Sequence, residues 1–387
     1  MVRLRQVFSP AFLIAALATS SWWQPAVAAD GDLAKLSKLF KYSTDPGAAD
    51  VGGLPSDTDL QTLLTDALTL ANAGVAAATD ALAGKAEAER LMNSLFMSPS
   101  ESDLQTIQKR FNGVVTYLTS GGKINNGAQK TKPFLLYGDG WRIRQDMKSE
   151  LRNADGETIP KADGSGNVLI EDDSLMVQKQ QQAKTIAEKD AVAQGKSASE
   201  AEDQYPYWSD SIQSYTFDKK WGDSPTVGVF DSGSSAIAFT LMDTDKALIN
   251  LGPKALQGGR LHAVDVTAVA NSLFEDHTPP TGSTITSIAE VAPQATAIFH
   301  ELFHLVWGDS LMYPSVGEEY QFQRMTGYES RGSGKKAFTK RYAMRNPQSY
   351  AYAAIAYDYT QNVQYKISNK KSAPVEFFTG FASYEKS

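Results

Sequence analysis

Four stretches of the chain carry apolar residues at the spacing that is typical of α-helices. They cover residues 57–96, 100–120, 285–310 and 346–363. We expect Asp57 or Thr58 to cap the first helix and Ser100 or Ser102 to cap the second, because short polar side chains accept hydrogen bonds from the free N–H groups at helix starts. The first two helices together predict a helical lobe.

Strand-like segments dominate the region from about residue 131 to residue 275. They are rich in β-branched and aromatic residues, and one of them contains a glycine-rich turn at 163–167. The segments cover residues 132–143, 156–172, 224–230, 235–242 and 246–252. A very polar interruption at 176–205 predicts a solvated helix or a surface insertion. Helices that precede and follow a set of strands are typical of an α+β fold.

The first 29 residues have the pattern of a secretory signal peptide. Arg3 and Arg5 precede an apolar run that starts at Phe8, and small residues at Ala28 and Ala29 are suitable for cleavage by a signal peptidase. The apolar run is about half the roughly 20 residues that a membrane-spanning helix needs, which disfavours a membrane anchor. We therefore expect a secreted, extracellular protein with a short leader or linker at 30–55. A single domain is expected at 56–387, with the polar insertion inside it.

Composition and charge indicate which binding partners are unfavourable for this protein. The chain has 387 residues, of which 42% are hydrophobic and 21% charged, so it can bury a large core. Loss of Arg3 and Arg5 with the signal peptide changes the formal net charge from −7 to −9. An acidic protein of this kind is poorly suited to bind nucleic acid or anionic membranes. The chain has no cysteine, so packing, aided by a bound metal ion, must provide its stability.

The sequence AIFHELFHLVWGDS at residues 297–310 carries the candidate chemistry. A helix advances by roughly 100° per residue, so His300, Glu301 and His304 share one face. Two histidines four residues apart can bind one zinc ion at roughly 2.0–2.1 Å. Glu301 is too close in sequence to be a further ligand, and we expect it to act as a general base on water. Apolar residues fill the rest of the helix, which predicts a helix that is buried except along this strip and that ends at Gly308.

A metal-free pair of hydrogen-bonded histidines is the alternative interpretation of this motif. A buried helix gains nothing from such a polar strip without a cation, so we favour the metal site. The other two histidines of the chain, His262 and His277, precede the motif and are expected at the surface or at strand ends.

A catalytic zinc site needs a third ligand from the protein. Position 310, where a third histidine would complete one common pattern, is a serine, so a carboxylate must provide this ligand. The acidic candidates that follow the motif are Asp309, Glu318, Glu319, Glu329 and Asp358. Glu318 and Glu319 follow a turn that contains proline and glycine, at a distance that lets the chain return to the metal.

Two later stretches of the sequence, together with the H-E-x-x-H motif, resemble those of a known protein family. They are YPSVGEEYQF at 313–322 and NPQSYAYAAIAYD at 346–358. Together with the H-E-x-x-H helix they resemble the deuterolysin and peptidyl-Lys metalloendopeptidase family, the aspzincins, which are secreted fungal zinc proteases. The resemblance extends from about residue 57 onward and is motif-specific only in the last third. It implies a zincin-like fold, in which a helical lobe and a small mixed or antiparallel sheet pack on the H-E-x-x-H helix.

The resemblance also implies a third ligand and an oxyanion donor. The family pattern Gly-Thr-x-Asp-x-x-Tyr-Gly puts Glu319 at the position of the ligand aspartate, with Glu318 as the alternative. The family tyrosine three residues later, which helps to stabilise the oxyanion, corresponds to Phe322. Because phenylalanine has no hydroxyl, Tyr320 or Tyr350 would have to replace it. Loss of one such donor typically lowers turnover on the order of a hundredfold or more.

The leading hypothesis is therefore a secreted zinc metalloendopeptidase. We expect a monomer that holds one Zn²⁺ ion through His300, His304 and Glu319 and hydrolyses peptide bonds of protein or peptide substrates. Strict lysine specificity is not expected, because Gln348 and Ala351 stand where lysine-specific members of the family have acids. The alternative is a non-catalytic secreted zinc-binding protein, an antigen or metal scavenger, on the same scaffold. Glu301 favours the enzyme, since zinc binding alone does not need a base.

Overall fold

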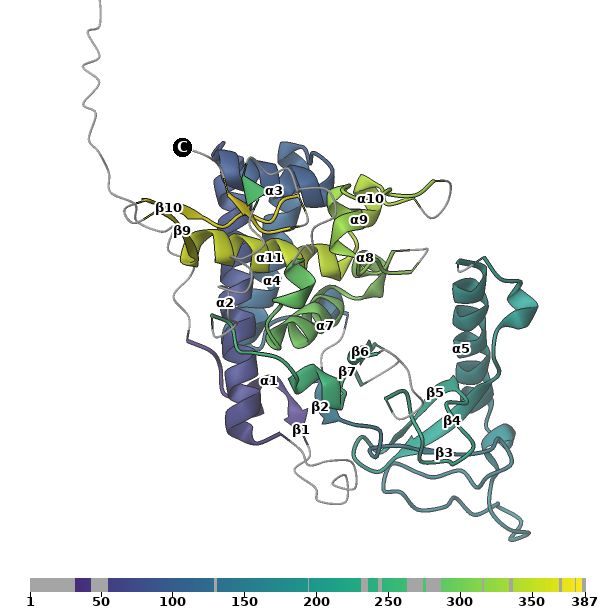
Figure 1. Ribbon diagram of the computed structural model, residues 1–387. Coiled ribbons are helices and arrows are strands. Elements are labelled where there is room, and N and C mark those ends of the chain that lie inside the picture. Colours follow the sequence, from purple (N-terminus) through teal and green to yellow (C-terminus); the bar gives the residue numbers. More distant parts are fainter. Residues whose placement is uncertain are drawn as a thin grey trace, which may run out of the picture. The chain divides into compact units, whose positions relative to one another are not determined.

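The computed structural model describes residues 32–42, 55–128, 131–193, 195–230, 236–242, 246–262, 274–275, 287–314, 317–333, 337–368, 371–379 and 381–384. The expected signal peptide and His277 lie outside these ranges. Helices occur together with small sheets (Figure 1), which confirms the expected α+β class. Within the described ranges, none of the helices combines the length and the apolar character that crossing a membrane requires.

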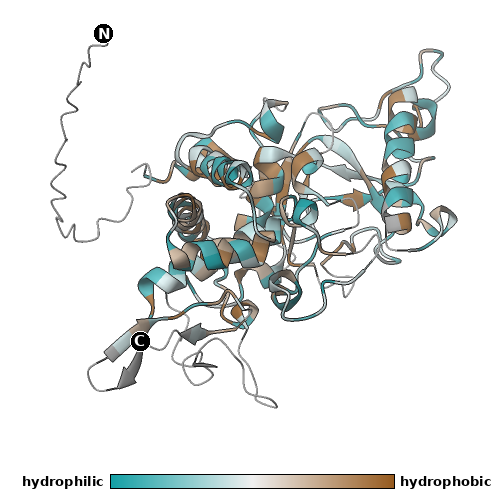
Figure 2. Cartoon of the chain, turned by 90° about the horizontal axis from the view of Figure 1, so that it is seen from above, coloured by the Kyte–Doolittle hydropathy of each residue, from teal (hydrophilic) through white to brown (hydrophobic). Residues whose placement is uncertain are grey.

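Five long helices form the helical body (Figure 1). They are α2 (Asp57–Leu82), α3 (Ala86–Phe96), α4 (Glu101–Ser120), α7 (Ala295–Trp307) and α11 (Pro347–Asn362). Helix α7 carries the H-E-x-x-H motif and packs against α2, α4 and α11. Polar and apolar residues alternate along the helices (Figure 2), and the apolar ones join one continuous core.

The helix starts follow the capping rules, although not always at the expected residue. Ser56 caps α2 and forms a capping box with Asp59. Asp57 and Thr58, the expected caps, are instead the first two residues inside the helix. Ser100 caps α4 as expected. A short turn at 83–85 divides the expected 57–96 helix into α2 and α3.

Part of the expected leader at 30–55 belongs to the domain. Helix α1 (Leu36–Leu39) and strand β1 (Lys41–Tyr42) lie in this segment, and β1 pairs in parallel with β2 (Phe134–Tyr137). Phe40 is 1% exposed, and the Tyr117 hydroxyl donates to the Leu39 carbonyl oxygen at 2.7 Å. The sequence did not predict these elements because they are too short to display a hydrophobic period.

A four-stranded mixed sheet contacts α7. Its strand order is β1, β2, β7 (Leu248–Leu251) and β6 (Ala238–Leu241), in which β2 and β7 are parallel and β6 is antiparallel to β7. In the part of the chain that the structure describes, β6 has no partner on its outer side. Contacts between β6 and α7 bring Thr240 to the helix that carries the motif.

A second, antiparallel sheet supports a long exposed helix. Strands β3 (Ile143–Arg144), β4 (Gln204–Ser209) and β5 (Ser214–Lys219) form this sheet, and α5 (Ser174–Ala193) packs against β4 and β5. Their shared core includes Ile170, Trp208 and Tyr215. Most described side chains of α5 are exposed or half-buried, as expected for a solvated helix in the polar segment at 176–205.

Several expected strands differ from the structure. Residues 156–172 form turns with isolated bridges such as Pro160 with Asn167, and 224–230 contains no regular strand. Conversely, β4 and β5 were not predicted. Pro206 argues against a strand at β4, whereas the alternation of Tyr215 and Phe217 with polar residues is a signal that could have identified β5.

The remaining elements are short. The short helices are α8 (Asp309–Met312), α9 (Phe322–Thr326), α10 (Lys340–Ala343) and the 3₁₀ helices Asn125–Gly127, Ile170–Asp172, Ala198–Glu200, Pro253–Leu256 and Ile288–Glu290. The short strands are β8 (Phe274–Glu275), β9 (Gln364–Ser368), β10 (Lys371–Pro374) and β11 (Ser383–Tyr384).

Helix α7 begins ten residues later than the expected 285, because Pro293 cannot lie inside an α-helix. It ends at Gly308, as expected.

Substitution of Gly308 by alanine should destabilise the protein. The φ of 75° and ψ of 157° at Gly308 lie in a region that glycine alone occupies readily, and an added Cβ would collide with the Asn125 side chain. The free energy of unfolding, measured by urea titration, should fall by about 1–3 kcal/mol. Gly164→Ala is the control, because its φ is 73° but no heavy atom lies within 4 Å of the added Cβ. Equal losses in the two variants would contradict the expected clash.

Candidate metal centre

The H-E-x-x-H side chains lie beneath the 317–321 loop and strand β6. His300, Glu301 and His304 are 4%, 7% and 7% exposed, so the expectation that this strip is the open face of α7 is wrong. The Tyr320 ring stacks on His300, with ring centroids 5.7 Å apart and planes inclined by 16°. The buried polar atoms of this strip therefore need partners inside the protein.

The carboxylate of Glu318 faces both imidazoles. Its Oε2 lies 3.1 Å from His300 Nε2, and its Oε1 lies 2.8 Å from His304 Nε2. One ligand atom from each of these three side chains lies within 4.8 Å of the other two. Among the described residues, this is the group of acids and histidines that could hold a metal ion.

Glu319, the expected third ligand, has different partners. Its Oε2 forms an ion pair with Arg324 at 2.8 Å, and its Oε1 accepts hydrogen bonds from the N–H groups of Tyr320 and Gln321 at 3.1 and 3.0 Å. Glu319 is therefore not the third ligand in this structure, and the alternative candidate, Glu318, takes that position. Adjacent residues of an extended segment point in opposite directions, so an error of one residue in register exchanges the two acids.

The three side chains fit a cation. In a tetrahedral zinc site with bonds of roughly 2.0–2.1 Å, neighbouring ligand atoms lie about 3.3 Å apart. The two nitrogen–oxygen separations, 2.8 and 3.1 Å, are close to that value. Glu318 Oε1 is buried, and its one close polar contact, His304 Nε2 at 2.8 Å, does not have the geometry of a hydrogen bond. A buried carboxylate oxygen in this situation is destabilising unless a positive charge balances it.

Each imidazole has a second partner at its other ring nitrogen. His300 Nδ1 lies 2.8 Å from Oε1 of Gln348 on α11, and His304 Nδ1 lies 3.1 Å from Oδ1 of Asp309 on α8. Because both partners accept hydrogen bonds, they favour a proton on Nδ1. The Nε2 atoms that face Glu318 are then available as metal ligands.

Helix α11 also holds the loop that carries Glu318. Asn346 Nδ2 donates to the Glu319 carbonyl oxygen at 2.9 Å, and Asn346 Oδ1 accepts from the Glu319 N–H at 3.2 Å. The Tyr352 hydroxyl donates to the Tyr320 carbonyl oxygen at 3.1 Å. The same helix therefore orients His300 and fixes the backbone next to Glu318.

Glu301 lies beside the ligand group but is not part of it. Its Oε2 accepts a hydrogen bond from Thr240 Oγ1 of β6 at 2.7 Å. Against the effect of burial, and together with Glu318, its negative charge helps to raise the pKa values of His300 and His304. This position is suitable for a group that exchanges protons next to a metal ion.

The two tyrosines expected near the oxyanion have different environments. Tyr320 is 57% exposed, and its hydroxyl donates to Glu318 Oε2 at 2.5 Å. Tyr350 is fully buried, where Arg110 donates to its hydroxyl at 2.8 Å and the hydroxyl donates to the Met344 carbonyl oxygen at 2.9 Å. The expected oxyanion role of Tyr350 is therefore wrong, because its side chain belongs to the core. Tyr320 is the member of this pair that reaches the centre.

Electrostatic interactions among the two imidazoles and the Glu318 carboxylate shift their pKa values. Burial alone would lower the pKa of both imidazoles, but Glu318 raises the pKa of His300, and Asp309 together with Glu318 raises that of His304 well above its ordinary value. Burial opposes ionisation of Glu318, yet the two imidazoles hold the pKa of its carboxyl far below the ordinary range. Positive charge is therefore favoured between the imidazoles and the carboxylate, whether protons or a metal ion supply it.

The other candidate ligands lie outside the centre. Asp358 on α11 has its Oδ2 2.6 Å from His262 Nε2, so these two residues pair with each other. Glu329 is exposed and does not belong to the metal group. His277 is not among the described residues.

Comparison of the chain with protein-family models, with curated proteins and with solved structures found no significant match. The function is therefore inferred from the chemistry of the centre.

Thr240, Gln348 and Asp309 hold the centre, and none of these contacts was predicted from the sequence. Thr240 and Gln348 are 61 and 48 residues away from their partners, so no local pattern connects them to the motif. Asp309 follows His304 by five residues. An acid in the turn directly after the motif is the one sequence signal that could have identified a partner for His304.

Zinc affinity should depend on Glu318 and much less on Glu319. Glu318→Gln removes the anionic oxygens that face the two imidazoles. The dissociation constant for zinc, measured by competition with a chelator, should then rise by at least about a hundredfold. Glu319→Gln makes the same chemical change one residue later and keeps an oxygen that can accept hydrogen bonds, so its effect should stay below about tenfold. The opposite ranking would restore Glu319 as the ligand.

Zinc binding should release protons and should strengthen as the pH rises. Because the pKa values of His300 and His304 are raised, both imidazoles keep their protons at pH values where an ordinary histidine has lost them. Zinc has to displace these protons, so its apparent affinity should increase as the pH rises through the raised pKa values. Calorimetry in buffers of different ionisation enthalpy measures the released protons. An affinity that stays constant from about pH 6 to about pH 8.5, without proton release, would contradict this coupling.

Proposed function

We propose that this protein is a zinc-dependent endopeptidase that hydrolyses peptide bonds of proteins or peptides. One observation carries the proposal: Glu318 faces the Nε2 atoms of His300 and His304, and Glu301, which directly follows His300 on α7, is not part of the ligand group. Two histidines and one glutamate are a ligand set of catalytic zinc sites, which keep a position for water. Structural zinc sites use four protein ligands instead.

Zinc is the metal that two imidazoles and one carboxylate favour in this setting. When bound, zinc would lower the pKa of water and polarise the carbonyl group of the scissile peptide bond. The remaining steps would be carried out by side chains of the protein.

Glu301 would transfer the proton during hydrolysis. Its carboxylate accepts a proton from the attacking water and delivers it to the leaving amine as the C–N bond breaks. The hydrogen bond from Thr240 to Oε2 fixes the orientation of this carboxylate, so that Oε1 would be the oxygen that exchanges the proton. A base in fixed orientation avoids the cost of reorganisation at the moment of reaction.

Tyr320 would stabilise the oxyanion that forms when water adds to the carbonyl group. Phe322, at the position of the family tyrosine, is fully buried against Tyr352. The Tyr320 hydroxyl lies at the centre, where it donates to Glu318. Although more than half of the Tyr320 side chain is exposed, its hydroxyl is bonded to the buried Glu318 carboxylate. Removal of the hydroxyl from water and the nearby carboxylates raise its pKa well above the ordinary value, so it keeps its proton and remains a hydrogen-bond donor.

A zincin-like fold is part of the proposal. It is supported by the position of α7, which contacts helices of the helical body and strands β6 and β7 of the mixed sheet. The outer side of β6 is free among the described residues, and Thr240 of this strand contacts Glu301. An extended substrate could add to such an edge strand through backbone hydrogen bonds.

Membership of the deuterolysin and aspzincin family is a further hypothesis, based on the motifs alone. The H-E-x-x-H helix and the 346–358 stretch support it. Glu318 precedes by one residue the position that the family pattern assigns to the ligand aspartate, which argues against a close relationship. We also propose that the protein is secreted, on the basis of the pattern of residues 1–29.

Replacement of Glu301 by glutamine should separate zinc binding from hydrolysis. Because the base is lost while the ligands remain, casein hydrolysis by the zinc-loaded variant should fall by at least about a hundredfold. The bound zinc, counted by atomic absorption, should equal that of the wild type. Glu329→Gln is the control, since Glu329 is exposed and is not part of the ligand group, and it should retain wild-type activity. Zinc binding by the wild type without hydrolysis would support a non-catalytic zinc-binding protein instead.

A further inference from the structure

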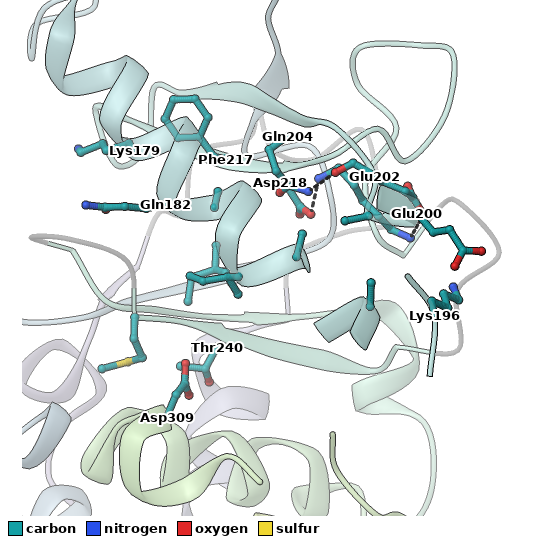
Figure 3. A pocket seen from close by; sticks show the side chains of 18 residues that line it. Lys179, Gln182, Lys196, Glu200, Glu202, Gln204, Phe217, Asp218, Thr240 and Asp309 are labelled. Carbon is teal, nitrogen blue, oxygen red and sulfur yellow. Dashed lines mark hydrogen bonds and ion pairs between the residues drawn. The ribbon is translucent and has the colours of Figure 1, made fainter. Parts of the chain in front are cut away.

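A cavity of ≈ 610 Å³ connects helix α5 with the surroundings of the metal centre. Lys179, Gln182 and Ile186 of α5 line one part of it, and Thr240 and Asp309 line another. Figure 3 shows Thr240 and Asp309 on the side opposite Lys179 and Gln182. Binding sites for organic ligands commonly have volumes of roughly 300–1,000 Å³, so the cavity is large enough for part of a peptide.

Two residues of the cavity lining contact the H-E-x-x-H motif. Thr240 donates to Glu301 at 2.7 Å, and Asp309 Oδ1 lies 3.1 Å from His304 Nδ1. Each of these residues therefore contacts both the cavity and a residue of the H-E-x-x-H motif. The cavity therefore lies next to the proposed active site.

Helix α5 presents an exposed apolar residue to the cavity. Ile186 is 60% exposed and is the large aliphatic residue of α5 that lines the cavity. Gln182 and Lys179 precede it by one and two turns, so the three residues form one stripe. A different face of α5 carries Met176, which packs on the core of the β3–β4–β5 sheet. The stripe is therefore not needed to attach the helix to its sheet.

Apolar surface continues across the cavity from Ile186. Phe217 of β5 and Leu241 and Met242 at the end of β6 contribute to the lining. The charged side chains of the lining have both signs; they are Lys179, Lys196, Lys219, Glu200, Glu202, Asp218 and Asp309. Charges of both signs select neither an acidic nor a basic ligand, whereas the apolar groups provide a surface for an aliphatic or aromatic side chain.

We propose that this cavity is a substrate subsite that binds a large apolar side chain, such as leucine or phenylalanine, of an extended polypeptide. This role rests on the proposed peptidase function and adds a specificity to it. Ile186 would contact the substrate side chain from α5, and Leu241 and Met242 would contact it from the opposite wall. Helix α5 would then act as the second wall of the substrate cleft.

Peptide binding to zinc-loaded Glu301→Gln protein tests this subsite without any need for hydrolysis. The probes are two fluorescein-labelled octapeptides that differ at one central position, leucine in one and asparagine in the other. Fluorescence anisotropy should give an affinity about tenfold higher for the leucine peptide, because an apolar side chain is removed from water. Ile186→Asp in the same background should abolish this difference between the peptides.

Val177→Asp is the matched control for Ile186→Asp. Val177 is 42% exposed and lies nine residues before Ile186, on the opposite face of α5 and outside the cavity. This variant should keep the preference for leucine, and both variants should keep wild-type zinc affinity. The subsite is refuted if Ile186→Asp retains the preference or if neither peptide binds. Preferential binding of the leucine peptide without hydrolysis by the wild type would instead reject the peptidase function and keep the binding site.

Discussion

The contact on which the centre depends is that between the Glu318 carboxylate and the two imidazoles of α7. Apart from Glu301, α7 contains no acid, and most of its other residues are apolar and buried. Two buried histidines on such a helix need a counter-charge from another part of the chain. Glu318 provides it from a loop fourteen residues after His304. The two imidazoles and the carboxylate together favour a single cation that all three side chains can bind.

The elements that pack against α7 also orient the residues of the metal centre. The partners of the centre come from α11, β6 and α8, and the first two pack on α7 within the hydrophobic body. Helix α11 contacts the centre twice, through Gln348 at His300 and through Asn346 at the loop that carries Glu318. A displacement of α11 would therefore move one ligand and the support of another together. Rigid elements that orient ligands through hydrogen bonds are what a catalytic metal site requires.

The sequence predicted the features that depend on residues close together along the chain. The period of apolar residues predicted α7 and α11, the capping rule predicted Ser100, and the spacing of His300, Glu301 and His304 predicted that they lie together. Glu318 and Glu319 could not be separated, because they are adjacent and have the same chemistry. Arg324 and the N–H groups of Tyr320 and Gln321 bind Glu319, and these contacts exist only in the folded loop. Tyr350 was misassigned for the same reason, since its contact with Arg110 joins positions 240 residues apart.

Anomalous diffraction from a crystal soaked in zinc tests the central claim most directly. Data on both sides of the zinc absorption edge locate each bound ion independently of any assumption about its ligands. We expect one strong peak at roughly 2.0–2.2 Å from His300 Nε2, His304 Nε2 and a carboxylate oxygen of Glu318. A peak ligated by Glu319, or the absence of a peak beside the two imidazoles at saturating zinc, would contradict this claim.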